Sequence, residues 1–143
     1  MKKLFLDTNV WLRFILEDSE QANDCRELIT QIEAGKWRVY TSTIVMLEIN
    51  YVLNSVYKIK IGQALGDLEA ILKIRNLTLI EKTDFRKALK FYKQTKIKLT
   101  DCLIAAQLPP EMILVSYDRD FQKFPVRVKR PDELGDEEFD KWH

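Results

Sequence analysis

Four acidic residues lie in unusual surroundings along this chain and could together support chemistry. Asp7, Glu48 and Asp101 are each the only charged residue in a long stretch of uncharged, mostly apolar sequence, and Asp118 follows closely on an apolar run. Moving a carboxylate out of water is costly unless a cation or hydrogen bonds compensate it. Each of these acids therefore indicates a partner that the neighbouring sequence does not supply.

The four acids are expected to meet at one edge of a parallel sheet. Asp7 and Asp118 each follow a predicted strand, whereas Glu48 and Asp101 lie early in predicted helices. Open α/β sheets bind their ligands at the carboxyl ends of the strands, where the strand order reverses. Both helices should begin at that same edge, so the simplest arrangement brings all four carboxylates together.

A cluster of four carboxylates suits a divalent metal ion. Like charges at close range raise the pKa values of such acids or drive them apart, and a cation removes that conflict. Oxygen ligands favour Mg²⁺ or Mn²⁺, whereas zinc is less well served, because the only histidine is the terminal His143. One or two such ions would activate a water and stabilise charge developing at phosphorus. The residue types therefore predict metal-assisted hydrolysis of a phosphodiester bond.

Each acid also has a structural alternative. An acid after a strand is often a turn residue or a helix cap, and the helix dipole favours Asp101 in the first turn of its helix. Glu48 is harder to explain in this way, since it lies too far into its helix to act as a cap. For each acid considered alone, a structural role stays open. The joint occurrence of all four favours a functional site.

Alternating strands and helices must position these acids. Strands are predicted at 3–6, 37–40, 77–80 and 112–115, with a fifth if the alternating segment 126–128 forms one, and helices at about 10–16, 19–34, 44–56, 61–74, 84–96 and 99–108. Strands that are apolar throughout and alternate with helices are typical of an α/β fold whose parallel sheet is covered on both faces. Helix 44–56 is apolar on several sides, so we expect it to be buried and to carry Glu48 into the interior or a cleft.

Length and composition fit one globular domain, residues 1–143. Hydrophobic residues make up 46% of the chain and charged residues 31%, as in folded rather than disordered proteins. The formal net charge of +1 does not by itself predict a nucleic-acid partner.

Cys25 and Cys102 lie in apolar helical patterns and are expected to be reduced core thiols of a cytoplasmic protein. Asp7 interrupts the first apolar run too early for a signal peptide, and we expect no membrane span.

Four motifs in order resemble those of the PIN domain family. They are Asp7-Thr8-Asn9 after the first strand, Ser42 with Glu48 in a capped helix, Thr100-Asp101-Cys102-Leu103-Ile104-Ala105-Ala106, and Ser116-Tyr117-Asp118-Arg119-Asp120-Phe121. The resemblance covers essentially the whole chain. In size, with no additional domain, the chain is most similar to VapC-type toxins of toxin–antitoxin pairs and to their small stand-alone relatives.

The resemblance implies a three-layer α/β/α sandwich with a central parallel sheet of four to five strands, and a Mg²⁺- or Mn²⁺-dependent endoribonuclease that acts on RNA. It also implies a homodimer and, for a toxin, a cognate antitoxin protein. Carried over residue by residue, it makes Asp7, Glu48, Asp101 and Asp118 the catalytic metal ligands, Asp120 a secondary ligand or a support for one, and Asn9 and Ser116 groups that orient the carboxylates.

Two groups of basic residues could contact an RNA backbone. Seven basic residues lie between Lys82 and Lys98 against one acid, although a solvated helix face explains them equally well. The second group is closer in sequence to the acids, and we expect Arg119, Lys123 and Arg127 to position substrate. Trp11 and Phe14 follow the first acid and are expected to lie in the core or at an interface. An exposed apolar patch there would suit an antitoxin or a second copy of the chain.

Other functions remain open at this level. A housekeeping RNA-processing nuclease of the same fold would use the same acids and would lack an adjacent antitoxin gene. A non-catalytic RNA- or protein-binding module is disfavoured by the intact set of acids. A phosphatase is disfavoured because Asn9 occupies the place of a second aspartate, and a phospho-receiver because Asp118 stands where a lysine is expected.

Overall fold

A computed structural model of the chain describes residues 2–17 and 19–135. The far end of the predicted domain, with most of the acidic tail and His143, lies outside these residues. The described elements, in chain order, are β1 (Lys2–Leu6), α1 (Thr8–Leu16), α2 (Gln21–Glu33), β2 (Trp37–Ser42), α3 (Thr43–Ser55), α4 (Ile61–Leu72), β3 (Leu77–Ile80), α5 (Phe85–Thr95), α6 (Leu99–Gln107), β4 (Ile113–Val115), the 3₁₀ helix η1 (Arg119–Lys123) and β5 (Arg127–Lys129).

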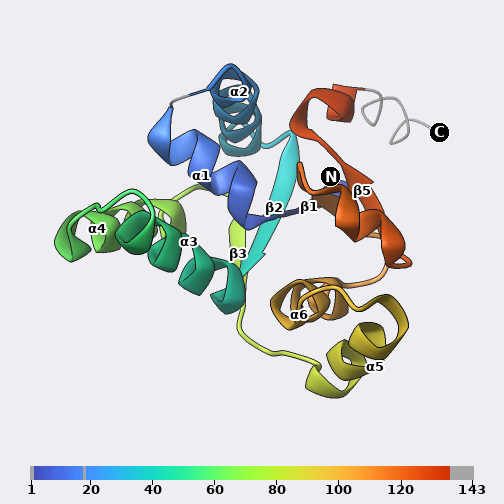
Figure 1. The fold of residues 1–143 in the computed structure, drawn as a ribbon. Helices are drawn as coiled ribbons and strands as arrows, with labels where there is room; N and C mark the ends of the chain where they lie inside the picture. The colour runs from blue at the N-terminus through green and yellow to red at the C-terminus, as the bar shows by residue number, and fades with distance from the viewer. Residues whose placement is uncertain (1, 18, 136–143) are drawn as a thin grey trace.

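The sheet has five parallel strands in the order β3-β2-β1-β4-β5. Helices α1 to α4 lie to one side of it, and α5, α6 and η1 lie to the other (Figure 1). The predicted α/β/α sandwich is thereby confirmed, and the fifth strand forms within one residue of its expected position. The chain builds outward from β1 in one direction through β2 and β3, and in the other through β4 and β5. The strand order therefore reverses between β1 and β4, where α/β sheets bind ligands.

The two central strands are buried on both faces, as their continuous apolar sequences predict. Leu4, Phe5 and Leu6 of β1 are fully buried, and so is all of β4. Trp11 packs α1 onto the sheet, because its indole Nε1 donates hydrogen bonds to the Leu6 carbonyl oxygen at 3.2 Å and to Thr41 Oγ1 at 3.3 Å. This side chain is fully buried, so Trp11 belongs to the core and not to an exposed patch after the first acid.

Helix α3 is only half covered, which corrects the prediction that it is buried on several sides. Val45, Ile49 and Leu53 face the core, whereas Leu47 and Tyr51 are among its most exposed large apolar residues. The apolar sequence of α3 therefore serves two faces, one packed against the fold and one open to solvent. No helix within residues 2–17 and 19–135 is long and apolar enough to cross a membrane.

Candidate active site

The first and fourth motifs meet at the carboxyl ends of β1 and β4. Leu6 lies opposite Val115 in the parallel register, and the Asp7 amide donates a hydrogen bond to the Val115 carbonyl oxygen at 3.0 Å. The strand order reverses between β1 and β4, and these two strands therefore end side by side. This arrangement confirms the expectation that Asp7 and the loop carrying Asp118 are neighbours.

Asp7 is held in a fixed position by groups from both motifs. Its side chain is almost fully buried, at 4% exposure. Oδ2 of Asp7 accepts hydrogen bonds from Ser116 Oγ at 2.8 Å and from Asn9 Nδ2 at 3.3 Å. The same Ser116 Oγ accepts a hydrogen bond from the Asp118 amide at 3.0 Å. Ser116 therefore links the position of one predicted metal ligand to the backbone of another.

Glu48 reaches the site from α3. Ser42 caps this helix by accepting a hydrogen bond from the Val45 amide at 3.3 Å, as the second motif predicts. Thr8 Oγ1 donates a hydrogen bond to Glu48 Oε1 at 3.0 Å, and Lys98 Nζ lies 3.7 Å from Glu48 Oε2. The Glu48 side chain retains 21% exposure, so it lies in a cleft rather than in the core.

Asp101 completes the cluster from the first turn of α6, and it is buried. Burial raises the pKa of Asp101 to about 7, the nearby Lys98 opposes that rise, and the charges of Asp7, Glu48 and Asp118 add to it. Burial likewise raises the pKa of Asp7 to about 6, against the lowering effect of the Ser116 hydrogen bond, with further increases from Glu48 and Asp118. The four acids thus lie within electrostatic range of one another, and Lys98 lies beside Glu48 and Asp101.

The cluster contains the kind of ligands that a hard cation prefers, but the carboxylates are not gathered around one common point. Within the described ranges, no three acidic, histidine or cysteine side chains already surround one point where a metal ion could sit. All the candidate ligands are carboxylate oxygens, the donors that Mg²⁺ and Mn²⁺ prefer. Glu48 and Asp118 are partly exposed, so a rotation of their side chains could bring oxygens toward buried Asp7 and Asp101.

Of the other predicted site residues, the structure places some near the acids and one away from them. The Asp120 amide donates a hydrogen bond to Asp118 Oδ1 at 2.9 Å, while its own exposed carboxylate lies 3.8 Å from Lys123 Nζ. Arg119 lines a hollow of about 170 Å³ together with Asp118. Arg127 instead lies opposite Ile113 at the amino end of β4, so the structure does not bring it to the acids.

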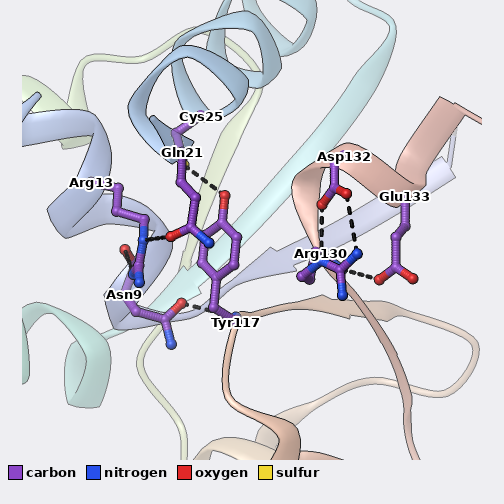
Figure 2. A network of polar contacts seen from close by, with 8 residues as sticks. All are labelled: Asn9, Arg13, Gln21, Cys25, Tyr117, Arg130, Asp132 and Glu133. Carbon is purple, nitrogen blue, oxygen red and sulfur yellow. Dashed lines mark hydrogen bonds and ion pairs between the residues drawn. The ribbon is translucent and has the colours of Figure 1, made fainter. Parts of the chain in front are cut away.

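A further network of polar contacts supports the loop after β4, and no pattern in the sequence predicts it. Arg13 stacks over the Tyr117 ring at 4.2 Å, bonds to the Gln21 side chain, and donates through Nη1 to the Asn9 carbonyl oxygen at 3.1 Å (Figure 2). The Tyr117 amide donates to Asn9 Oδ1 at 3.2 Å, and Cys25 Sγ lies 3.6 Å from Tyr117 Oη. These contacts tie α1 and α2 to the segment that presents Asp118.

Asp101→Asn is expected to stabilise the metal-free protein at about pH 8 by on the order of 2 kcal/mol. The pKa of Asp101 rises from an ordinary 3.8 to about 7 on folding. The folded chain therefore binds this proton more tightly than the unfolded chain does, and stability is lost as the pH rises through the interval between those two values. Thermal unfolding with a chelator present measures the effect. The gain should vanish near pH 4, and the exposed Asp24→Asn serves as control; a gain that is independent of pH would contradict the assignment.

The sequence matches a known protein family. The PIN domain profile matches residues 4–126. A curated relative, the VapC ribonuclease of Aquifex aeolicus (strain VF5), is 25% identical over 128 residues, which cover 88% of this chain and 95% of that protein.

Solved structures share the fold. VapBC2 from Rickettsia felis, solved bound to a DNA fragment from their promoter, superposes with a TM-score of 0.65 at 20% identity, covering 90% of this chain and 98% of that one. A protein from Pyrobaculum aerophilum gives a TM-score of 0.68 at 12% identity over 97% of this chain and 90% of the other. VapBC-1 from nontypeable Haemophilus influenzae gives 0.64 at 15% identity, over 92% and 99%. Because the PIN profile spans most of the chain, including all four clustered acids, the chain belongs to the PIN domain family.

Proposed function

We propose that this chain is a Mg²⁺- or Mn²⁺-dependent endoribonuclease in which Asp7, Glu48, Asp101 and Asp118 would hold one or two ions. The observation that carries the proposal is the electrostatic state of the cluster. Burial raises the pKa values of two of its carboxylates, Asp7 and Asp101, and the nearby acids add to the rise, while within the described residues the ammonium group of Lys98 lies beside Glu48 and opposes the rise at Asp101. Such an excess of negative charge is a site for a cation.

Each residue has a defined task in this scheme. When bound, a divalent cation lowers the pKa of a water and stabilises the charge that develops on the scissile phosphate. Ser116 and Asn9 fix the carboxylate of Asp7, and Thr8 fixes that of Glu48. Asp120 supports Asp118 through its backbone amide and is available as a further ligand. Arg119 and Lys123 lie close enough to Asp118 and Asp120 to guide the RNA backbone.

The activity is tested by incubating the protein with a pool of structured and unstructured RNA in Mn²⁺, in Mg²⁺ and in EDTA. Internal cuts that appear with either metal and disappear with EDTA are expected, and mapping them gives the preferred sites. Cleavage that persists in EDTA would point to a metal-independent nuclease. If Mn²⁺ does not bind and no RNA is cut, the non-catalytic binding module becomes the better explanation.

The relatives favour a toxin of a type II toxin–antitoxin pair. The curated relative is named a VapC ribonuclease, and two of the similar structures are VapBC proteins. The exposed apolar side chains of α3 and α4 would suit a protein partner, either the antitoxin or a second copy in a homodimer; they include Leu47, Tyr51, Ile61 and Leu65. Two free cysteines in the described chain fit a reducing cytoplasm. Expression with and without the adjacent upstream gene separates a toxin from a stand-alone RNA-processing nuclease.

Asn9→Ala is expected to lower the rate of RNA cleavage by roughly 10- to 100-fold, the range seen when a group that orients a metal ligand is removed. The substitution removes one hydrogen bond to Asp7 and another to the Tyr117 amide. Cleavage rates at saturating Mn²⁺ measure the effect. Asn50→Ala, on the same kind of half-buried helical position away from Asp7, is the matched control. Equal losses in both variants would argue against an orienting role for Asn9.

A further inference from the structure

Helix α5 carries an exposed apolar stripe that the proposed chemistry does not use. Phe85, Leu89 and Tyr92 are spaced four and three residues apart, so they lie along one face of the helix. Their exposures are 50%, 40% and 41%. Ala88 and Phe91 of the same helix are buried and pack it onto the fold. The apolar stripe is thus left open to solvent by a helix that is otherwise firmly anchored.

The same helix concentrates positive charge. The segment 85–98 has six basic residues and no acid, although the whole chain has a net charge of only +1. Arg86, Lys90 and Lys93 are spaced as neighbours along the helix, where like charges destabilise it. Within residues 2–17 and 19–135, none of these three cations forms an ion pair with an acidic side chain. By contrast, Lys123 and Arg130 near the fourth motif are paired with Asp120 and Asp132.

We propose that this face of α5 binds a single-stranded segment of RNA. Phosphates would neutralise Arg86, Lys90 and Lys93, and bases would stack on Phe85 and Tyr92, which is how proteins hold single strands without reading their sequence. A duplex would satisfy the cations but would leave the aromatic rings uncovered. A second copy of the same face would cover the rings but would bring two sets of unpaired cations together.

The carboxyl end of α5 leads to the acid cluster. Lys96 Nζ lies 5.6 Å from the centre of the Tyr92 ring, and two residues later Lys98 Nζ lies 3.7 Å from Glu48. A strand lying along α5 would therefore enter the site beside a predicted metal ligand. This step rests on the proposed nuclease function, because it identifies the bound segment as part of the substrate. RNA binding to α5 is itself independent of cleavage.

The test is binding of a short fluorescent oligouridylate, measured by fluorescence anisotropy on the full chain with Asp7→Asn in every sample, so that cleavage cannot interfere. Removing three cations with Arg86→Gln, Lys90→Gln and Lys93→Gln should weaken binding at least tenfold and reduce the slope of log affinity against log salt by about two. Phe85→Ala with Tyr92→Ala should weaken binding about fivefold or more and leave that slope unchanged. A matched control removes the exposed cations Lys58, Lys60 and Lys73 and should change affinity less than either.

Three results would overturn the proposal. The first is an equal loss in the control triple variant, which would mean a general effect of net charge. The second is equal competition by a duplex RNA. The third is unchanged RNA binding together with a changed oligomeric state in size-exclusion chromatography, which would make α5 a protein interface. If wild-type protein fails to cut RNA while the binding results hold, the nuclease proposal fails and this one stands. If it cuts RNA and the α5 variants bind and cut normally, the reverse is true.

Discussion

Asp7→Asn is expected to reduce metal-dependent RNA cleavage by about a thousandfold, a loss of roughly 4 kcal/mol of transition-state stabilisation. The variant keeps the shape of the side chain and removes its charge. Asp7 is the most constrained acid of the cluster, since Ser116 and Asn9 both donate hydrogen bonds to its Oδ2. Single-turnover cleavage at saturating Mn²⁺ measures the effect.

The fold should survive this change. Burial raises the pKa of Asp7 from 3.8 to about 6, so ionisation of this side chain lowers the stability of the metal-free folded protein at neutral pH. The amide should therefore give a melting temperature equal to or higher than that of the wild type when a chelator is present. Asp24→Asn on the exposed surface of α2 is the control and should cleave normally. Activity of Asp7→Asn within tenfold of the wild type would contradict the role of Asp7 as a metal ligand.

Saturating Mn²⁺ is expected to raise the melting temperature by about 5–10 °C. A ligand present at a hundred times its dissociation constant stabilises the folded state by roughly 2.7 kcal/mol, and each kcal/mol moves the midpoint of a domain of this size by about 2–4 °C. The physical source is relief of repulsion among the four acids. Differential scanning fluorimetry measures the shift, with potassium chloride at equal ionic strength as a control for general screening.

The same shift should shrink as the pH falls. Metal binding requires ionised carboxylates, and protons compete for them below their pKa values. These values are about 6 for Asp7 and about 7 for Asp101, so we expect the Mn²⁺ effect to be largest near pH 8 and to decline through both values. Asp101→Asn should lose most of it. An equal shift in wild type and variant at both ends of this range would mean that Mn²⁺ binds elsewhere.

The position of the acids could be predicted because it follows from the topology of parallel sheets. Asp7 comes directly after an apolar run and Asp118 closely after another, and strand ends in such a sheet share one edge. Ser42 also behaved as its type and spacing suggest, as the cap of α3. Local chemistry and chain order were sufficient for these features, since neither depends on the angle at which helices pack.

Other contacts depend on tertiary packing, and no local pattern specifies them. The Thr8–Glu48 hydrogen bond joins α1 to α3 across forty positions of sequence, and the Lys98–Glu48 pair joins α3 to the residue before α6. Arg13 and Tyr117 meet in the same way. Hydrophobic patterning also does not distinguish a core from a surface awaiting a partner. That limit explains why α3 was expected to be covered, and why Trp11, whose indole makes two buried hydrogen bonds, was assigned to either the core or an interface.

In the proposed mechanism, the acid cluster binds a divalent cation and this cation drives RNA hydrolysis. The most direct test measures Mn²⁺ binding by isothermal titration calorimetry and RNA cleavage rate over the same range of Mn²⁺ concentrations, on one preparation of the wild-type protein. We predict that the two half-saturation points coincide and that Asp7→Asn shifts or abolishes both. Cleavage that saturates where no Mn²⁺ is bound, or binding that survives loss of Asp7, Glu48, Asp101 and Asp118 together, would contradict this account.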